Sequence, residues 1–235
     1  MDSSNYSKVL QRLTSYRNSL NKTQAEMGEQ FGIDQSHYWK IESGSKRISY
    51  KSLKYFEEQG GDVCYLITGI PRNYGKMDEL IARCRTTEGK KDLLEVMLWA
   101  MNQGIGLDHQ KSTISPRSYR SLKLFQGESD SVSVWENIRR VEGISQVRMA
   151  EILDINIKRY RRIEKMSVYP DSEILNTLYC ELEYSPLTIL DSRLYYLDEM
   201  NYMWEGFSDT VKDKLEVFLE TALDLIIENE SEYNE

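Results

Sequence analysis

The sequence predicts an all-α protein built from two copies of one helical unit, and three observations lead to this prediction. Proline and glycine are scarce, with 4 and 13 residues among 235, which argues against long disordered or low-complexity tracts. Apolar residues recur at helical spacing in several segments. Two long segments of the chain also align with each other without a gap, at an offset of 122 residues.

The repeat is clearest between residues 23–44 and residues 145–166. Seven positions in and just before these segments hold the same residue type in both copies: Arg17 and Arg139, Gln24 and Gln146, Met27 and Met149, Ile33 and Ile155, Tyr38 and Tyr160, Ile41 and Ile163, Glu42 and Glu164. A weaker match links residues 90–101 with residues 211–222, at an offset of 121. We therefore expect two units of about 110 residues, each a compact helical domain followed by a helical extension.

Bulk composition limits the function classes. The formal net charge is -8, and the acids concentrate after residue 190. No run of eighteen apolar residues and no secretory signal is present, so we expect a cytoplasmic protein with no membrane partner. Three distant cysteines (Cys64, Cys84 and Cys180) and two histidines offer neither a zinc site nor a nucleophile–histidine pair. We expect buried reduced thiols, no metal or other cofactor, and no enzymatic activity.

Helix starts in the repeated segments have a physical basis. Thr23 and Ser145 are good N-cap residues, and Glu26 completes a capping box with Thr23. Asp34 and Asn156 are N-caps for the helix that follows. Gly32 permits a tight turn between the two helices of the first copy. Each copy is thus expected to contain two short helices joined by a tight turn.

The second of these helices carries most of the local charge in copy 2. Tyr160 and Ile163 are three residues apart, so they share one face, and we expect that face to be buried. Turning about 100° per residue places three cations on the opposite face and two on the flanks. The outward cations are Lys158, Arg162 and Lys165, and the flanking ones are Arg159 and Arg161. Copy 1 has Ser36, Lys40 and Ser43 at the outward positions, with Gln35 near the helix start.

Residues 13–46, "LTSYRNSLNKTQAEMGEQFGIDQSHYWKIESGSK", resemble the helix-turn-helix of Xre/Cro-type transcriptional regulators. The positions that carry the resemblance are Arg17, Thr23, Gln24, Gly28, Gly32, Ile41, Glu42 and Gly44, and "YLITG" at 65–69 resembles the close of this domain. The likeness covers roughly residues 7–69 and 130–190. It implies two tandem Cro/lambda-repressor-like domains in a prokaryotic or phage regulator that binds double-stranded DNA.

The resemblance assigns DNA contacts in the first copy. Gln35 is expected to contact a base edge, since glutamine pairs with adenine through two hydrogen bonds. Gln24 resembles the family's phosphate-contacting glutamine. The remaining expected contacts come from Ser36, Lys40, Ser43, Lys46 and Arg47, the last two reaching the DNA backbone from the loop after the helix.

The second copy departs from the family pattern. Ile157 stands where copy 1 has Gln35, so a thymine methyl contact would replace amide readout. Met166 replaces Gly44, which weakens the usual helix stop. Expected DNA contacts here are Gln146, Lys158, Arg159, Arg161, Arg162 and Lys165. The alternative is a degenerate module that only packs against its partner.

The expected organisation is a first helix-turn-helix domain at 5–70, an extension at 71–107, a basic linker at 108–130, a second domain at 131–191 and an acidic extension at 192–235. The linker is either solvated or a strap along the DNA backbone. Residues 192–204 are expected to be core, with a peptide or ligand groove as the alternative. The apolar stripe of the last helix comprises Val211, Leu215, Phe218, Leu219, Ala222, Leu225 and Ile226, and it must pack on residues 93–101, on a second chain as a homodimer, or on a partner protein.

Two functions follow from these expectations. The first is a repressor-like, sequence-specific regulator that uses its two non-identical domains as a single-chain pseudo-dimer on an asymmetric DNA site. The alternative is a protein-interaction regulator, antitoxin-like or anti-repressor, which sequesters a partner through its acidic C-terminal helices.

Overall fold

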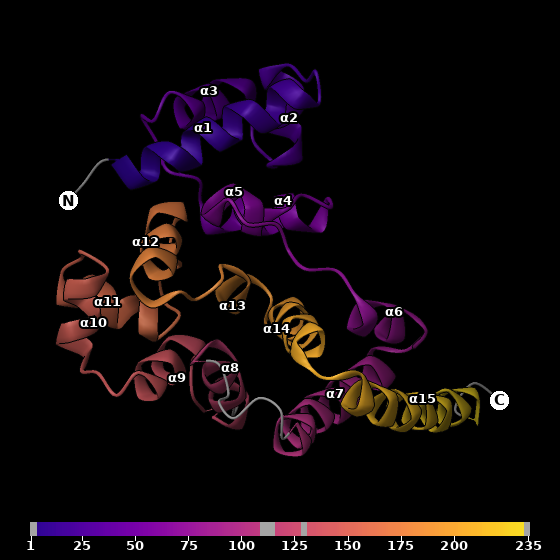
Figure 1. Cartoon of the computed structure of the whole chain (residues 1–235). Helices are drawn as coiled ribbons and strands as arrows, with labels where there is room; N and C mark the ends of the chain where they lie inside the picture. The colour runs from indigo at the N-terminus through magenta and orange to yellow at the C-terminus, as the bar shows by residue number, and fades with distance from the viewer. Residues whose placement is uncertain (1–3, 109–115, 128–130, 233–235) are drawn as a thin grey trace. The chain divides into compact units, whose positions relative to one another are not determined.

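The computed structural model describes residues 4–108, 116–127 and 131–232. Within these ranges the chain forms fifteen α-helices and no β-strand, which confirms the all-α prediction (Figure 1). The single extended pairing in the described residues is an isolated antiparallel bridge between Ser49 and Asp171. No helix in the described part is long and apolar enough to cross a membrane.

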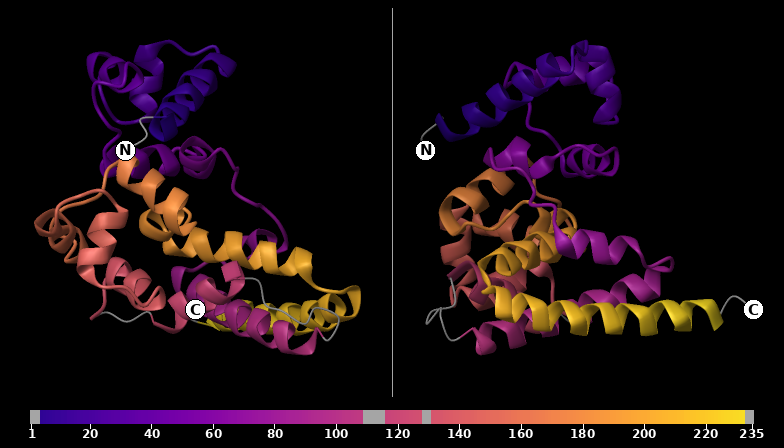
Figure 2. Two further views of the ribbon diagram at one scale, coloured as in Figure 1. Left: turned by 60° about the vertical axis from the view of Figure 1, so that its left-hand side comes forward. Right: turned by 45° about the vertical axis from the view of Figure 1, so that its right-hand side comes forward.

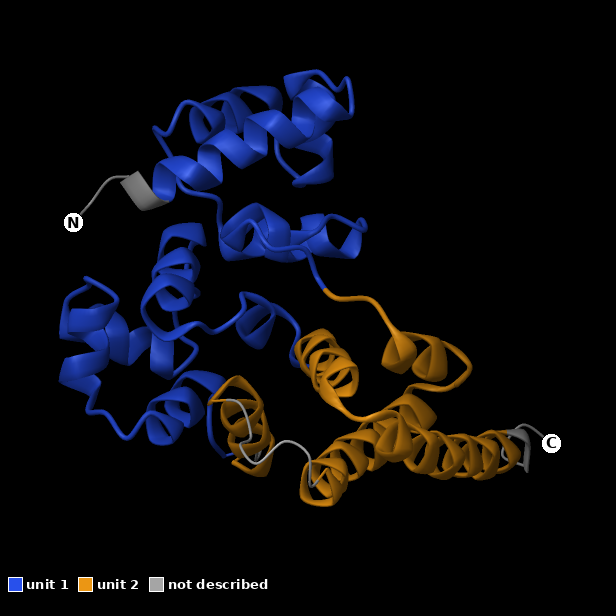
Figure 3. Ribbon diagram, viewed as in Figure 1, with its two compact units in different colours: residues 1–72, 128–192 blue, residues 73–127, 193–235 orange. Residues whose placement is uncertain are grey.

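The helices fall into two compact units (Figure 3). Unit 1 comprises residues 1–72 and 128–192, and unit 2 comprises residues 73–127 and 193–235. Unit 1 therefore contains both copies of the repeated domain, and unit 2 contains both extensions. The chain passes from one unit to the other close to residues 72, 127 and 192.

Each copy in unit 1 has five helices. Those of copy 1 are α1 (Ser4–Ser19), α2 (Gln24–Gln30), α3 (Gln35–Glu42), α4 (Tyr50–Glu58) and α5 (Val63–Thr68). Those of copy 2 are α9 (Val134–Val141), α10 (Gln146–Ile152), α11 (Ile157–Glu164), α12 (Ser172–Leu182) and α13 (Leu187–Leu190). The second, third and fourth helices of the two copies begin 122 residues apart, as the sequence repeat predicts.

Local sequence explains where these helices begin. Thr23 and Glu26 form the expected capping box, with Thr23 Oγ1 accepting from the Glu26 amide at 3.2 Å. Asp34 and Asn156 cap α3 and α11 by accepting the amides of His37 and Arg159 at 2.8 and 2.9 Å. These side chains satisfy amides that have no carbonyl partner in the first helical turn.

The turns of the two copies share left-handed backbone positions 122 residues apart. Gly32 (φ 65°) matches Asp154 (φ 50°), and Gly44 (φ 78°) matches Met166 (φ 54°). The expected weaker helix stop at Met166 stays a prediction about stability, and it does not move the helix end. α11 still ends at Glu164, and Met166 takes the left-handed conformation that glycine adopts in copy 1. A residue with a Cβ is strained in this conformation.

The apolar positions of both copies form equivalent cores. Tyr38 and Tyr160 are fully buried, as are Ile41 and Ile163. In copy 1 the ring of Phe31 stacks on Phe56, with 4.4 Å between centroids. α3 and α11 thus present their predicted apolar face to the core, which turns the opposite face outward.

The two copies pack on each other inside unit 1 through equivalent elements. α5 contacts α12, and α13 contacts α4, so each copy offers the same pair of helices to the other. The bridging residues Ser49 and Asp171 are themselves 122 positions apart. An interface in which equivalent residues meet is the arrangement of a two-fold symmetric dimer. Here it joins two segments of one chain.

Unit 2 pairs the two extensions in the same way. It contains α6 (Lys76–Ala82), α7 (Thr87–Leu107), α8 (Pro116–Gln126), α14 (Ser192–Gly206) and α15 (Asp209–Glu232). α15 runs along α7, and both views in Figure 2 show the two helices side by side. Of the expected partners for the last helix, residues 93–101 of α7 are the ones observed. The expected core role of residues 192–204 is confirmed for Tyr195, Tyr196, Met200 and Met203, which are buried in α14.

Two details of the last helix and one thiol differ from the sequence prediction. α15 buries Val211, Leu215, Leu219 and Leu223, whereas Phe218 and Leu225 are 40% and 59% exposed. The predicted stripe was too wide because the helices packed on α15 cover only part of its amphipathic face. Cys64 and Cys84 are buried, as expected, but Cys180 is exposed.

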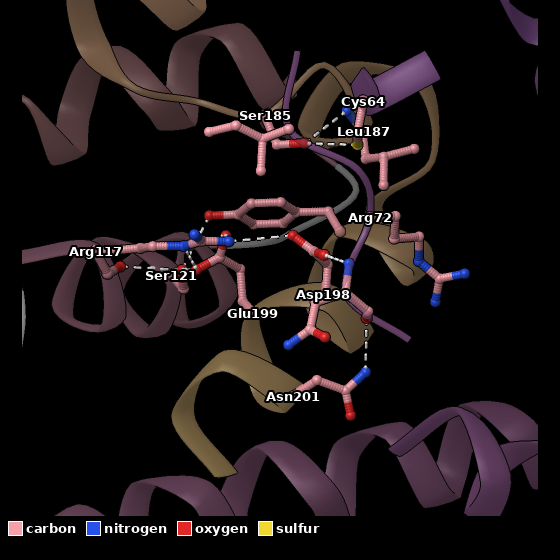
Figure 4. Close-up of polar contacts among 12 residues, drawn as sticks. Cys64, Arg72, Arg117, Ser121, Ser185, Leu187, Asp198, Glu199 and Asn201 are labelled. Carbon is pink, nitrogen blue, oxygen red and sulfur yellow. Dashed lines mark hydrogen bonds and ion pairs between the residues drawn. The ribbon is translucent and has the colours of Figure 1, made fainter. Parts of the chain in front are cut away.

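The segment expected to be a basic linker contains a packed helix. Pro116 starts α8, in keeping with the preference of proline for the first helical turn. Leu122 and Leu124 are buried, and Arg117 forms ion pairs with Asp198 at 3.1 Å and Glu199 at 2.8 Å (Figure 4). Burial raises the pKa of Glu199, and the hydrogen bond from Arg117 opposes that shift. Arg117 is thus engaged inside unit 2, and residues 109–115 and 128–130 lie outside the described residues.

Candidate nucleic-acid interface

α11 and its C-cap residue expose four cations, the three expected to face outward and one from a flank: Lys158, Arg162, Lys165 and Arg161. Their exposure agrees with the helical spacing, because Tyr160 and Ile163 are buried on the other side. In the described part of the chain no carboxylate pairs with Lys158, Arg162 or Lys165. Arg161 Nε donates to Gln146 Oε1 at 3.2 Å, a neutral partner that leaves its charge uncompensated. This face is therefore a local positive surface on an acidic protein.

α3 presents a less charged face. Gln35 and Lys40 are exposed on it, and Lys46 is exposed in the loop that follows. Ser36 Oγ donates to the N-cap Asp34 at 2.7 Å, and Ser43 Oγ donates to the Lys40 carbonyl at 3.2 Å. The two serines thus take part in the caps of α3, whereas Gln35 and Lys40 project towards solvent. The outward faces of α3 and α11 differ in chemistry although the helices are equivalent in the repeat.

Gln24 and Gln146 belong to a three-residue network that recurs in both copies. Gln24 Nε2 donates to Glu42 Oε2 at 2.6 Å, and Arg17 Nε donates to the other oxygen at 2.9 Å. In copy 2 Gln146 and Arg139 bind Glu164 in the same way, with Arg139 Nε at 2.7 Å from Glu164 Oε1. Each amide nitrogen of a glutamine carries two hydrogens, so one of them stays available to an outside acceptor.

These networks hold the first turn of α2 and α10 against the last turn of α3 and α11. Burial acts to raise the pKa of Glu42, but the hydrogen bonds from Arg17 and Gln24 outweigh it and lower that pKa. The Glu42 hydrogen bond raises the pKa of Arg17. An ionised glutamate between an arginine and a glutamine fixes the angle between the two helices of each copy.

Arg47 and Arg159 differ from the other cations expected to contact DNA because each forms an ion pair with a carboxylate of the protein. Arg47 forms an ion pair with Glu173 at 2.9 Å, and Arg159 forms one with Asp171 at 3.0 Å. Arg159 lies on the flank of α11 that faces the start of α12, where Asp171 is the N-cap. Arg47 lies at the end of the loop after α3, where the two copies meet.

Sequence reasoning missed the residues that join the two copies. Ser172 Oγ bonds to the Tyr6 hydroxyl at 2.6 Å and accepts the Ile48 amide at 3.1 Å. Ser172 N in turn donates to the Ile48 carbonyl at 2.9 Å. In the repeat alignment Ser49 and Asp171 occupy equivalent positions, and this was the only sequence signal for the contact. An alignment alone does not show that equivalent residues touch.

Among the described residues no three histidine, cysteine, aspartate or glutamate side chains gather as a metal site requires. An anionic ligand matches the charge of the exposed residues described above. These are the cations of the outward face of α11, the polar outward face of α3 and Lys46.

Comparison of the chain with protein-family models, with curated proteins and with solved structures found no match.

Proposed function

We propose that this protein is a sequence-specific, repressor-like regulator of transcription that binds double-stranded DNA through α3 and α11. Each helix would lie in the major groove as the recognition helix of a helix-turn-helix domain. The two domains would act as a pseudo-dimer within one chain. The observation that carries the proposal is the set of cations on the outward face of α11 that lack carboxylate partners in the described residues.

Electrostatics supports a nucleic-acid partner for this face. Like charges on one short helix face repel each other, and an acidic chain has many carboxylates with which it could neutralise them. Other cations of the described chain, such as Lys54, Lys76 and Arg83, do form ion pairs. Phosphates supply the missing negative charge, and release of their counterions makes binding strongly dependent on salt.

The differing faces of α3 and α11 support an asymmetric DNA site. Gln35 and Lys40 suit adenine and guanine edges, whereas Lys158 and Arg162 suit guanine and phosphate. Different side chains would thus contact the two halves of the DNA site. A palindromic site bound by one chain would contradict this part of the proposal.

Selection of bound duplexes from a random pool tests the proposal. We expect an asymmetric consensus, and binding that weakens steeply as salt rises. The selection is then repeated with Lys40→Ala and with Arg162→Ala, and each change should relax a different half of the site. If Arg162→Ala changes nothing, copy 2 has a structural role. Absence of binding to any duplex at low salt would reject the DNA-binding function.

One observation favours the second candidate, a protein-interaction regulator. α7 and α15 expose Trp99 and Phe218, whose rings lie 5.3 Å apart, together with Val217 and Leu225. Exposed apolar residues on a pair of packed helices suit a protein partner. Under this function Phe218→Ser combined with Leu225→Ser would abolish regulation in cells, while the Lys40→Ala and Arg162→Ala chains would keep it.

A further inference from the structure

The contact between the two copies joins the end of α3 to the start of α12. Arg47 follows α3, and its Nη1 donates to the carbonyl of Gly44, in the turn just after that helix, at 3.2 Å. Its Nη2 reaches across to Glu173 Oε1 in copy 2 at 2.9 Å. The guanidinium also lies over the ring of Tyr6, 4.2 Å from the centroid. Arg47 is thus held by both copies.

The connection continues from Glu173 to α11. The Glu173 amide donates to Asp171 Oδ1 at 3.1 Å, so Asp171 caps the helix that carries Glu173. Arg159 of α11 donates to the other oxygen of Asp171 at 3.0 Å. An unbroken series of polar contacts therefore runs from the end of α3 through Arg47, Glu173 and Asp171 to Arg159 on α11.

The Arg47–Glu173 pair is specific to the contact between copy 1 and copy 2. Position 51 is equivalent to Glu173 in the repeat, and it holds a lysine. Pairing of two first copies would therefore set Arg47 against Lys51, which is repulsive. Position 169 is equivalent to Arg47, and it holds a tyrosine that stacks on Tyr50 with 4.6 Å between ring centroids. The two copies therefore hold different residues at equivalent positions, and these residues favour contact between copy 1 and copy 2.

We propose that Arg47, Glu173, Asp171 and Arg159 form a clamp that holds α3 and α11 at one separation and thereby sets the spacing between the two halves of the DNA site. Arg47 and Arg159 act on this account as positioning residues and do not contact DNA themselves. The part of the proposal that concerns DNA rests on the function proposed above, whereas the clamp itself does not.

Half-site spacing is the property that such a clamp controls. Each added base pair moves one half of a site along the duplex and rotates it about the duplex axis, so two rigidly held helices accept a single spacing. A loosened pair of helices accepts several spacings. The clamp therefore acts on the ratio of affinities for different spacings, whereas the outward cations act on the affinity for all of them.

The first experiment measures the clamp without DNA. Spin labels are placed at two equivalent exposed positions, through Ser36→Cys and Lys158→Cys, in a chain that also carries Cys180→Ser. Pulsed dipolar spectroscopy then gives the distribution of distances between α3 and α11. We expect a narrow distribution, which broadens with Glu173→Gln or Arg47→Ala and narrows again in the charge exchange Arg47→Glu with Glu173→Arg.

A matched control separates the clamp from a general loss of charge. Glu136 pairs with Arg140 within one helix at 2.6 Å, away from the contact between copies. Glu136→Gln removes the same charge as Glu173→Gln, so it should leave the distribution narrow. A distribution that stays unchanged with Glu173→Gln and with Arg47→Ala, in chains that melt cooperatively, would overturn the proposal, as would failure of the charge exchange to restore it.

The second experiment uses the duplex selected above and versions with one or two base pairs inserted between its halves. Glu173→Gln should reduce the preference for the original spacing by about two- to fivefold, the range that a half-exposed ion pair supports. Removal of an acidic side chain raises the affinity for every duplex alike. This general effect cancels because the measured quantity is a ratio of affinities. A protein that binds no duplex at all rejects the proposed function but leaves the distance measurement to decide on the clamp.

Discussion

Glu42 and Glu164 show how single residues keep the two copies alike. Each accepts from an arginine of the first helix and from a glutamine of the second, and each lies at the last turn of the third. The bonds are charge-assisted and poorly exposed, since the side chains of Glu42 and Glu164 are 9% and 6% exposed. A glutamate at this position therefore contributes both stability and helix orientation.

Glu42→Gln should destabilise the protein by about 1–3 kcal/mol at neutral pH, because it leaves Arg17 without its anion. Since the pKa of Glu42 is lower in the folded protein, the stabilisation is present above the pKa of the unfolded side chain, about 4.3, and is lost as pH falls through the folded pKa. Urea unfolding between pH 3 and pH 7 should show the two proteins converging at acid pH. A constant difference across this range would contradict the assignment.

Met166→Gly should stabilise copy 2, because Met166 has a left-handed backbone (φ 54°) that glycine adopts without strain. We expect a gain of about 1 kcal/mol, seen as a higher melting temperature. The neighbouring substitution Ser167→Gly is the control, since that position is not left-handed, and it should give no gain. A loss of stability with Met166→Gly would show that side-chain packing of Met166 outweighs the strain.

At the scale of elements, helices of the first half of the chain pack on helices of the second half. α4 and α5 pack on α13 and α12 in unit 1, and α7 packs on α15 in unit 2. Close approach in unit 2 depends on Gly104, where an added Cβ would lie 2.8 Å from Leu215 Cδ1 and 2.9 Å from Phe207 Cζ. Side-chain atoms fill the space that a larger residue would need.

Gly104→Ala should therefore destabilise the α7–α15 pair by about 1–3 kcal/mol through overpacking. Gly106, two residues on in α7, is exposed and has nothing within 4 Å of an added Cβ. Gly106→Ala should stabilise by about 0.5–1 kcal/mol, because alanine favours the helix. The melting temperatures of the two variants should therefore shift in opposite directions. Equal effects of the two substitutions would exclude packing as the cause.

At the scale of the whole molecule, a single chain supplies both sides of the contact between the two copies of the repeated domain. Its two copies of the repeated domain already contact each other within unit 1. A dimeric regulator needs two chains for that contact, whereas here the linked copies have a high effective concentration for each other. A second chain finds this surface occupied.

Under the function proposed above, one chain should bind one DNA site. We expect a free mass near 27.6 kDa and a complex that contains a single chain for each duplex. Sedimentation velocity or native mass spectrometry measures both quantities. Two chains on the duplex that carries a single selected site would contradict the pseudo-dimer.

Much of this protein follows from local sequence patterns. The repeat at an offset of 122, the caps at Thr23, Asp34 and Asn156, and the inward face of Tyr160 and Ile163 all predict helices that the structure contains. These features depend on neighbours within a few residues, so hydrogen-bonding capacity and helical spacing suffice to identify them. The residues proposed to face DNA were found in the same way.

Tertiary structure alone decided which of those residues are exposed cations and which are engaged. Arg159 and Lys158 are neighbours in the sequence, yet Arg159 pairs with Asp171 whereas Lys158 points to solvent. The segment expected to be a linker contains α8, and its Arg117 pairs with Asp198 and Glu199 from a segment about eighty residues away. Such contacts depend on distant parts of the chain meeting in space. A sequence lists charges without their partners, and only the folded chain assigns partners to them.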